Sequence, residues 1–126
     1  MTASPRHRAT LGRSERLRRG ADFRAVYATR ARAADGRLVV YARANGRDVT
    51  RLGLSVGRRC GGSVERNRTK RLLREAFRQA RHTFPLGFDV VLVPLGRDWT
   101  FDEVDRRLRA LVPEAIRRVR KKAGPA

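Results

Sequence analysis

The side chains whose types and spacing indicate a binding function lie together in one charged segment, residues 65–81. Helical spacing of about 100° per residue places the apolar side chains on one side, namely Leu72, Leu73, Ala76, Phe77 and Ala80. The opposite side carries polar side chains, namely Asn67, Lys70, Arg71, Arg74, Arg78 and Arg81, and Arg66 and Arg68 flank them from the first turn. Guanidinium and ammonium groups donate hydrogen bonds to phosphate oxygens. The segment therefore predicts a helix that packs on one face and binds a polyanion with the other.

A solvated basic surface is the plain alternative, because the outer faces of surface helices are usually polar. Two features favour anion binding. Like charges three and four residues apart repel, and Arg66 and Arg68 in the first turn oppose the positive end of the helix dipole, so stability does not account for them. The free N–H groups of that turn, after Gly61-Gly62 and with Ser63 as a candidate N-cap, would add to an anion site.

The whole chain, like this segment, has an excess of basic residues. Its 126 residues include 31 Lys and Arg against 12 Asp and Glu, for a net charge of +19. Such a charge attracts nucleic acid or an anionic membrane surface. We expect nucleic acid, because every basic residue except Lys70, Lys121 and Lys122 is arginine, which suits bidentate phosphate contacts and base stacking. Codon bias in a GC-rich genome would also explain the excess of arginine over lysine.

Several functional classes find no support in the sequence. No stretch approaches the roughly 20 apolar residues that span a bilayer, and the N-terminus has no apolar segment of a secretory signal, so we expect a cytoplasmic protein without membrane contact. The single cysteine, Cys60, offers no metal-ligand spacing with His7 or His82 and is expected to be a packing residue. We find neither a catalytic triad nor paired carboxylates, and we assign no catalytic and no metal-binding residue.

The elements that would position the basic helix belong to one α+β domain, predicted over residues 21–122 between a basic, flexible arm (1–20) and a short tail (123–126). Leu11 and Leu17 could dock the arm on the domain. Phe23, Val26 and Tyr27 have the spacing of a short first helix. Two strands are predicted at 38–42 and 51–56, with a turn at 45–46 between them, and the apolar run at 88–93 predicts a strand covered on both faces.

The last part of the chain predicts two helices. Thr100 and Glu103 form a capping box that opens the first, and Pro113 is expected to end it and to begin the second. The expected order is α-β-β-β-α-β-α-α, and spatial strand order does not follow from the pattern.

One run of residues closely resembles the protein subunit of bacterial ribonuclease P. It comprises Gly53-Leu54-Ser55-Val56, Arg58-Arg59, Arg66-Asn67-Arg68, Lys70-Arg71 and Arg74. Asp22-Phe23 and Val26-Tyr27 resemble the first helix of that family, so the resemblance spans roughly residues 11 to 120. The sequence departs from the family at Gly57 and Gly62, where the family carries side chains. The resemblance implies an α/β sandwich with an unusual left-handed βαβ crossover through the basic helix.

The resemblance also implies a function. Ribonuclease P is a ribonucleoprotein endonuclease, a hydrolase whose RNA subunit uses Mg²⁺ to remove the 5′ leader of precursor tRNA, whereas the protein subunit does not cut RNA itself. The implied partners are the catalytic RNA and precursor tRNA, with no obligate protein partner. Docking on the catalytic RNA would involve Arg66, Asn67, Arg68, Lys70, Arg71, Arg74 and Arg78.

The single-stranded leader would bind in a second place, a cleft between the first helix and the sheet. By resemblance, its residues would be Phe23, Tyr27, Tyr41, Ser55, Arg58 and Arg59. Aromatic rings stack unpaired bases for about 1–3 kcal/mol each with little sequence preference. Ordinary core packing would also explain the spacing of Phe23 and Tyr27 and the place of Tyr41.

Two rival classes share part of this pattern. A ribosomal or other structural RNA-binding protein would have the charge and the α+β order, but it would not need an aromatic cleft beside the basic helix. A stand-alone nuclease would need acids or histidines that converge on a metal ion or a phosphate.

Overall fold

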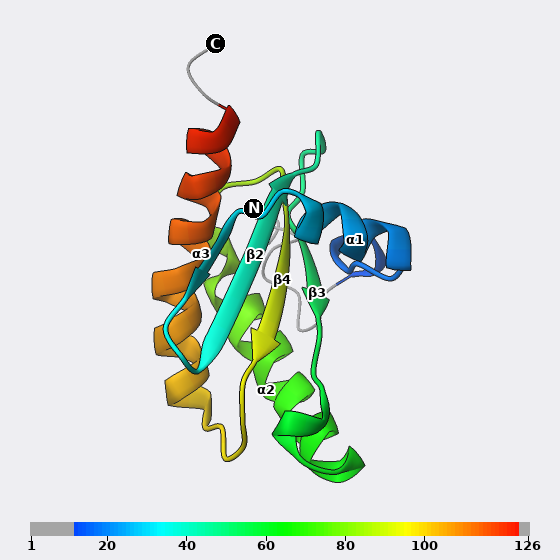
Figure 1. Cartoon of the computed structure of the whole chain (residues 1–126), viewed down its shortest axis with the longest axis vertical. Coiled ribbons are helices and arrows are strands. Elements are labelled where there is room, and N and C mark those ends of the chain that lie inside the picture. Colours follow the sequence, from blue (N-terminus) through cyan, green and yellow to red (C-terminus); the bar gives the residue numbers. More distant parts are fainter. Residues whose placement is uncertain (1–11, 124–126) are drawn as a thin grey trace, which may run out of the picture.

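The computed structural model describes residues 12–123, which form a four-stranded sheet and three α-helices (Figure 1). The helices are α1 (Gly20–Ala28), α2 (Ser63–Ala80) and α3 (Phe101–Ala123). The strands are β1 (Arg32–Ala34), β2 (Leu38–Ala44), β3 (Arg51–Leu54) and β4 (Phe88–Pro94). Short 3-10 helices occur at η2 (Arg13–Glu15), η3 (Arg58–Cys60) and η4 (Arg81–Thr83). The predicted α+β class and single domain are confirmed for these residues.

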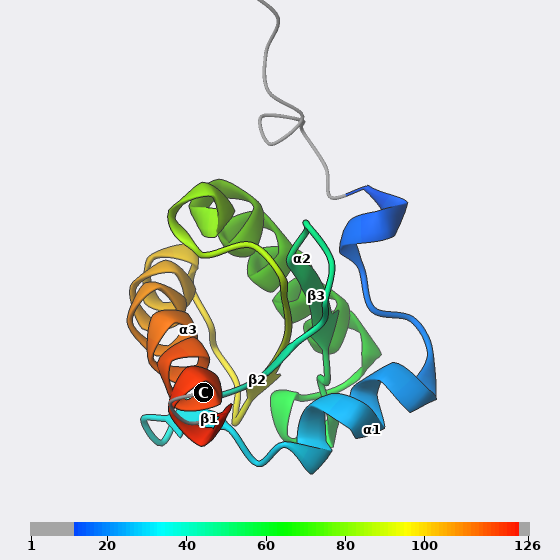
Figure 2. The ribbon, with the colours of Figure 1, turned by 90° about the horizontal axis from the view of Figure 1, so that it is seen from above.

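The sheet separates two layers of helix. Its spatial order is β1-β2-β4-β3. One face packs against α2 and α3 through a large apolar core that includes Val40, Val90, Leu92, Phe77 and Leu108. The other face carries α1, and a smaller cluster centred on Val26 and Val91 joins them. Figure 2 shows α1 on the opposite side of the sheet from α2. As predicted, β4 is covered on both faces, with Val90, Val91 and Leu92 fully buried.

The connection from β3 through α2 to β4 has the left-handed crossover that the resemblance implied. β3 and β4 pair in parallel, with Leu52 opposite Val90. In Figure 1 both strands run downwards, β4 lies to the left of β3 and α2 lies behind the sheet, which fixes the hand of the connection. Right-handed crossovers are the general rule, so no sequence pattern would predict this one.

The prediction of two helices after β4 is wrong, because α3 runs without interruption through Pro113. Its start is as expected, with the Glu103 N–H donating to the Thr100 side chain at 3.2 Å. Proline removes one hydrogen bond from the interior of a helix. Here Leu111 and Val112 before it and Ala115 and Ile116 after it are all buried. Packing of that stripe on the sheet outweighs the lost hydrogen bond.

The described part of the predicted arm lies against the domain. The Leu17 N–H donates to the Leu52 carbonyl at 2.8 Å, and the Leu17 side chain is buried beside Val26. Arg16 forms an isolated parallel bridge with Leu52, so this segment contacts the outer edge of β3 at Leu52. Leu11 and the residues before it, and residues 124–126, lie outside the described part. Within that part, no helix has the length and apolar character needed to cross a membrane.

Candidate nucleic-acid interface

The predicted basic helix forms as α2, and its predicted apolar stripe faces the core. Leu73, Ala76, Phe77 and Ala80 are buried, and Leu72 is half-buried at the edge of the core. The N-cap is Gly62 rather than the candidate Ser63. The reason is Glu65, whose carboxylate accepts a hydrogen bond from the Gly62 N–H at 3.0 Å. Glu65 thus already neutralises part of the positive end of the helix dipole, where the sequence predicted a bound anion from outside the chain.

The face of α2 that points away from the core is basic and weakly compensated. Five of its predicted RNA-binding cations form no ion pair with any described residue, namely Arg66, Arg68, Lys70, Arg71 and Arg74. Arg68 donates to the Trp99 carbonyl at 3.3 Å, while Asn67 and Arg71 are exposed. The Arg66 Nε is buried without an acceptor among the described residues, a state that costs about 1–3 kcal/mol. The stability of the free protein therefore does not explain why so many unpaired cations lie on this face.

The C-terminal end of the same helix differs from the prediction. Arg78 donates to the Glu75 carboxylate through its Nε at 3.1 Å, and this pair raises the pKa of Arg78 and lowers that of Glu75. Arg81, predicted on the basic face, is instead buried, and its guanidinium donates to Glu15 at 2.7 Å. The reason is that α2 ends at Ala80, and η4 turns Arg81 towards η2. The uncompensated cations therefore concentrate in the first two-thirds of α2.

A pocket of about 280 Å³ connects this basic face with α1. Its floor is apolar, formed by Leu17, Phe23, Leu52 and Leu54, and its rim carries four cations, Arg16, Arg18, Lys70 and Arg74. Burial together with the positive charges of Arg16 and Arg71 lowers the pKa of Arg74. A cation in such surroundings is stabilised by an incoming anion. Sequence spacing did not reveal Arg16 and Arg18, because they come from the segment that precedes α1.

The aromatic residues proposed for the leader gather between α1 and the sheet. The rings of Tyr27 and Tyr41 meet edge to face with centroids 4.9 Å apart, and both residues are half-buried. Phe23 lies over Gly53 of β3, where a Cβ atom would come within 2.8 Å of its ring. Glycine at this position thus permits α1 to approach the sheet. Its importance was not visible in the sequence, because it depends on a contact between distant segments.

The remaining residues proposed for the leader lie beyond β3. Ser55 is half-buried, and its N–H continues the ladder by donating to the Leu92 carbonyl at 3.0 Å. Arg58 and Arg59 lie on η3, are exposed and form no ion pair with a described residue. Cys60 next to them is buried against Pro94, as expected for a packing residue. The structure thus presents two more free cations between the sheet and the start of α2.

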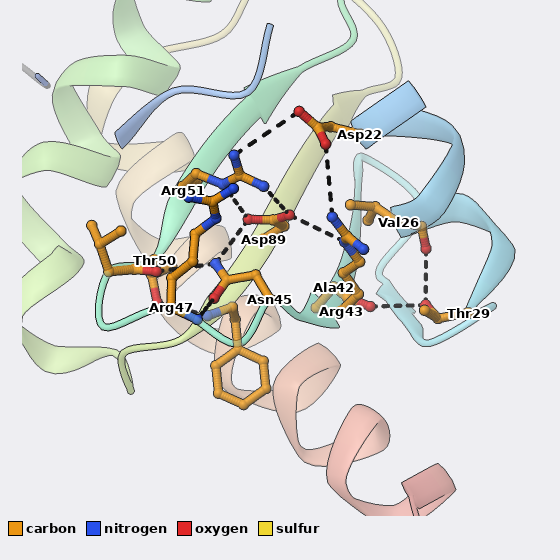
Figure 3. A network of polar contacts seen from close by, with 12 residues as sticks. Asp22, Val26, Thr29, Ala42, Arg43, Asn45, Arg47, Thr50, Arg51 and Asp89 are labelled. Atoms are coloured by element: carbon orange, nitrogen blue, oxygen red, sulfur yellow. Dashed lines mark hydrogen bonds and ion pairs between the residues drawn. The ribbon is translucent and has the colours of Figure 1, made fainter. Parts of the chain in front are cut away.

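A buried charge network fixes the sheet beneath α1 (Figure 3). Asp89 of β4 is fully buried and accepts two hydrogen bonds from Arg51, at 2.7 and 2.8 Å, one from Arg43 at 3.1 Å and one from Asn45 at 2.9 Å. Burial alone would raise the pKa of Asp89, but the hydrogen bonds and charges of these partners lower it. Asp22 of α1 lies 3.8 Å from Arg43 and 3.9 Å from Arg51.

This network was missed from the sequence, although one signal was present. Asp89 is the only charged residue in the apolar run at 88–93, and a lone acid in a central strand calls for buried cationic partners. Asp22 then links those partners to the helix that carries Phe23 and Tyr27. Within residues 12–123, no three His, Cys, Asp or Glu side chains come together as a group that could hold a metal ion.

Comparison with known proteins agrees with this fold. The family model described as Ribonuclease P matches residues 11–116. The ribonuclease P protein component of Clostridioides difficile (strain 630) is 34% identical over 105 residues, which cover 81% of this chain and 92% of that protein. The ribonuclease P protein component of Oleidesulfovibrio alaskensis is 44% identical over 89 residues, covering 69% of this chain and 71% of that protein.

Solved structures share the fold. The RNase P protein from Thermotoga maritima superposes with a TM-score of 0.67 at 35% identity, over 76% of this chain and 93% of that one. The RNase P protein of Staphylococcus aureus gives a TM-score of 0.67 at 30% identity, over 78% and 92% of the two chains. On the matched model, the relatives and the common fold, this chain belongs to the ribonuclease P protein family.

Proposed function

We propose that this protein is the subunit of ribonuclease P that binds the catalytic RNA and the 5′ leader of precursor tRNA in the cytoplasm. It thereby assists the endonucleolytic removal of the leader without supplying a catalytic group. In this proposal the Mg²⁺ ions that the hydrolysis needs are bound mainly by the RNA subunit, and no further protein partner is required.

The observation that carries the proposal is the uncompensated face of α2. Arg66, Arg68, Lys70, Arg71 and Arg74 have no acidic partner among the described residues, although the chain pairs many of its other arginines. Repulsion along one helix face is a cost in the free protein that phosphate groups of a bound RNA would remove. This supports α2 as the surface that docks on the catalytic RNA.

The aromatic residues between α1 and the sheet support a separate site for the leader. Tyr27 and Tyr41 are half-buried with their rings in edge-to-face contact, and the exposed part of an aromatic ring can stack unpaired bases of any sequence. Leaders of different precursor tRNAs differ in sequence, so a site without base-specific donors is suited to them. α1 lies on the opposite face of the sheet from α2 (Figure 2), so both RNA segments could be bound at once.

The experiment that tests this function is reconstitution. The purified protein is mixed with a bacterial ribonuclease P RNA and labelled precursor tRNA at low Mg²⁺. We expect cleavage and substrate affinity to rise above those of the RNA alone, and a variant carrying Arg68→Ala and Arg71→Ala to need a higher protein concentration for the same effect. An RNA-binding protein without a role in cleavage would leave both quantities unchanged, and a stand-alone nuclease would cleave without the RNA.

A further inference from the structure

A second group of uncompensated cations lies at the far end of the molecule, on the last turn of α3. Arg117 and Arg118 both pair with Glu114, whereas Arg120, Lys121 and Lys122 form no ion pair with a described residue. Cations near a helix C-terminus favour the helix dipole, which accounts for part of this charge. In Figure 1 the end of α3 lies at the top of the molecule and the start of α2 at the bottom, so these cations are remote from the proposed docking face.

A groove of about 450 Å³ opens between this turn and α1. Its walls include the small or apolar side chains of Ala25, Ala31 and Val119, and among the described residues its only charged lining residues are Arg43 and Lys122. This volume falls within the range of ligand sites, about 300–1,000 Å³. The groove therefore combines an apolar surface with two cations and no acid.

The groove is distinct from the leader cleft. Ala25 of α1 and Thr29, the C-cap residue of this helix, are four residues apart and share one flank, whereas Phe23 and Tyr27 share another. Thr29 closes the groove and directs its hydroxyl to the carbonyls of Val26 and Ala42, at 2.8 and 2.9 Å (Figure 3). An RNA segment in the groove would therefore not be the segment stacked on Tyr27.

Arg43 is held in place before any ligand arrives. Its Nε donates to the fully buried Asp89 at 3.1 Å, which fixes the plane of the guanidinium group (Figure 3). One terminal nitrogen lies 3.8 Å from Asp22, too far for a hydrogen bond, so no described residue accepts from the terminal N–H groups. A preorganised guanidinium with free donors is suited to bidentate binding of phosphate.

We propose that this groove binds one nucleotide of an RNA strand, with its phosphate held by Arg43 and Lys122 and its base packed against Ala25 and Val119. The proposal rests on the proposed function only in that the partner is RNA. Charge favours an anionic occupant, because Lys122 has no acidic partner among the described residues and the terminal N–H groups of Arg43 have no hydrogen-bond acceptor there, although Arg43 already pairs with Asp89.

The first test probes the apolar part of the groove. The full chain, labelled with ¹⁵N, is titrated with an unstructured oligouridylate of about eight nucleotides, within the range of single-strand site sizes. We expect shifts at Ala25, Thr29 and Lys122 that saturate together. Ala25→Leu should abolish these shifts by filling the groove, while the matched control Ala28→Leu, an exposed position on the same helix outside the groove, should retain them. Ala123→Leu fills the groove from the exposed end of α3 and repeats the test if Ala25→Leu unfolds.

The second test probes the phosphate contact. Lys122→Gln should lower the slope of log affinity against log salt by about 0.7, the value for one phosphate contact on a single strand. Lys121→Gln removes the same charge from the same turn but does not line the groove, and its slope should change less. Equal effects of both variants, or groove shifts that survive both groove-filling substitutions, would overturn the proposal.

Two further outcomes would also overturn it. The first concerns a chain that ends at Ala123, measured without RNA. If its groove signals already lie where RNA moves those of the full chain, the natural occupant of the groove is the segment 124–126. Shifts that follow protein concentration rather than oligouridylate would assign it to a second copy. Oligouridylate binding in the groove by a protein that fails reconstitution would contradict the proposed function alone, and reconstitution without groove binding would contradict the groove alone.

Discussion

Arg71 provides the most direct test of the proposed docking face of α2, because its side chain is exposed and has no acidic partner among the described residues. Replacing it with alanine should weaken binding to the catalytic RNA and reduce the salt slope by about one unit, the value for one phosphate contact. The slope is measured from binding titrations at several salt concentrations. Arg106→Ala, at an exposed and unpaired position on α3, is the matched control and should leave the slope unchanged. An equal change in both variants would move the docking face away from α2.

Asp89 is the residue on which the sheet beneath α1 depends most. Asp89→Asn should lower the free energy of unfolding at pH 7 by about 3 kcal/mol, because it leaves Arg51 and Arg43 without their buried carboxylate. Asp105→Asn breaks a partly exposed pair with Arg109 and should cost less than about 1 kcal/mol.

The pH dependence of Asp89→Asn follows from the pKa of Asp89. Because folding lowers that pKa, the stability it contributes is present above the pKa of the unfolded chain and is lost as the pH falls through the folded pKa. Urea unfolding of both chains should therefore differ at pH 7 and converge as the pH is lowered below about 4. A difference that is independent of pH over this range would mean that packing, not charge, is lost in the variant.

At the scale of elements, the placement of α1 depends on close contact with β3. Gly53→Ala would put a Cβ atom 2.8 Å from the Phe23 ring and 3.0 Å from Leu17, and so should displace α1. We expect weaker binding of precursor tRNA by the reconstituted enzyme, with binding to the catalytic RNA unchanged, because α2 lies on the other face. Gly57→Ala is the control, since a Cβ there meets nothing within 4 Å and its φ of −97° suits any residue. Equal losses in both variants would contradict this account.

The elements show where sequence reasoning succeeds and where it stops. Local periodicity was sufficient for α2, whose buried stripe of Leu73, Ala76 and Phe77 is the predicted one. It failed at Pro113, because the free energy of packing α3 along the sheet is not a local property. It also left β1 unplaced, since a three-residue strand with one buried side chain has no readable alternation.

The residues of the candidate site also fall into two groups, those that sequence spacing places correctly and those that only the fold brings together. The basic residues of α2 are contiguous on a helix, so spacing alone places them together. Arg16, Arg18 and Gly53 join the site through contacts between distant segments, and Arg81 leaves it because α2 ends one residue earlier. The role of the aromatic residues, like the left-handed crossover, came only from the family resemblance.

At the scale of the whole molecule, a net charge of +19 is distributed unevenly. Acidic residues pair with arginines in the Asp89 network and along α3, while most cations in the first two-thirds of α2 and in the last turn of α3 remain uncompensated among the described residues. The unpaired positive charge therefore forms distinct surfaces rather than a uniform shell, and separate variants can test each surface for RNA binding.

The central claim is that the protein binds the leader in the α1 cleft, separately from its contact with the catalytic RNA on α2. The most direct measurement is the ratio of the affinities of the reconstituted enzyme for precursor and mature tRNA, at saturating protein. We predict that Tyr27→Ala lowers this ratio by about 5- to 150-fold, the equivalent of 1–3 kcal/mol for one stacked base, while Arg71→Ala leaves it unchanged. Loss of affinity for precursor and mature tRNA to the same extent in Tyr27→Ala would contradict the account.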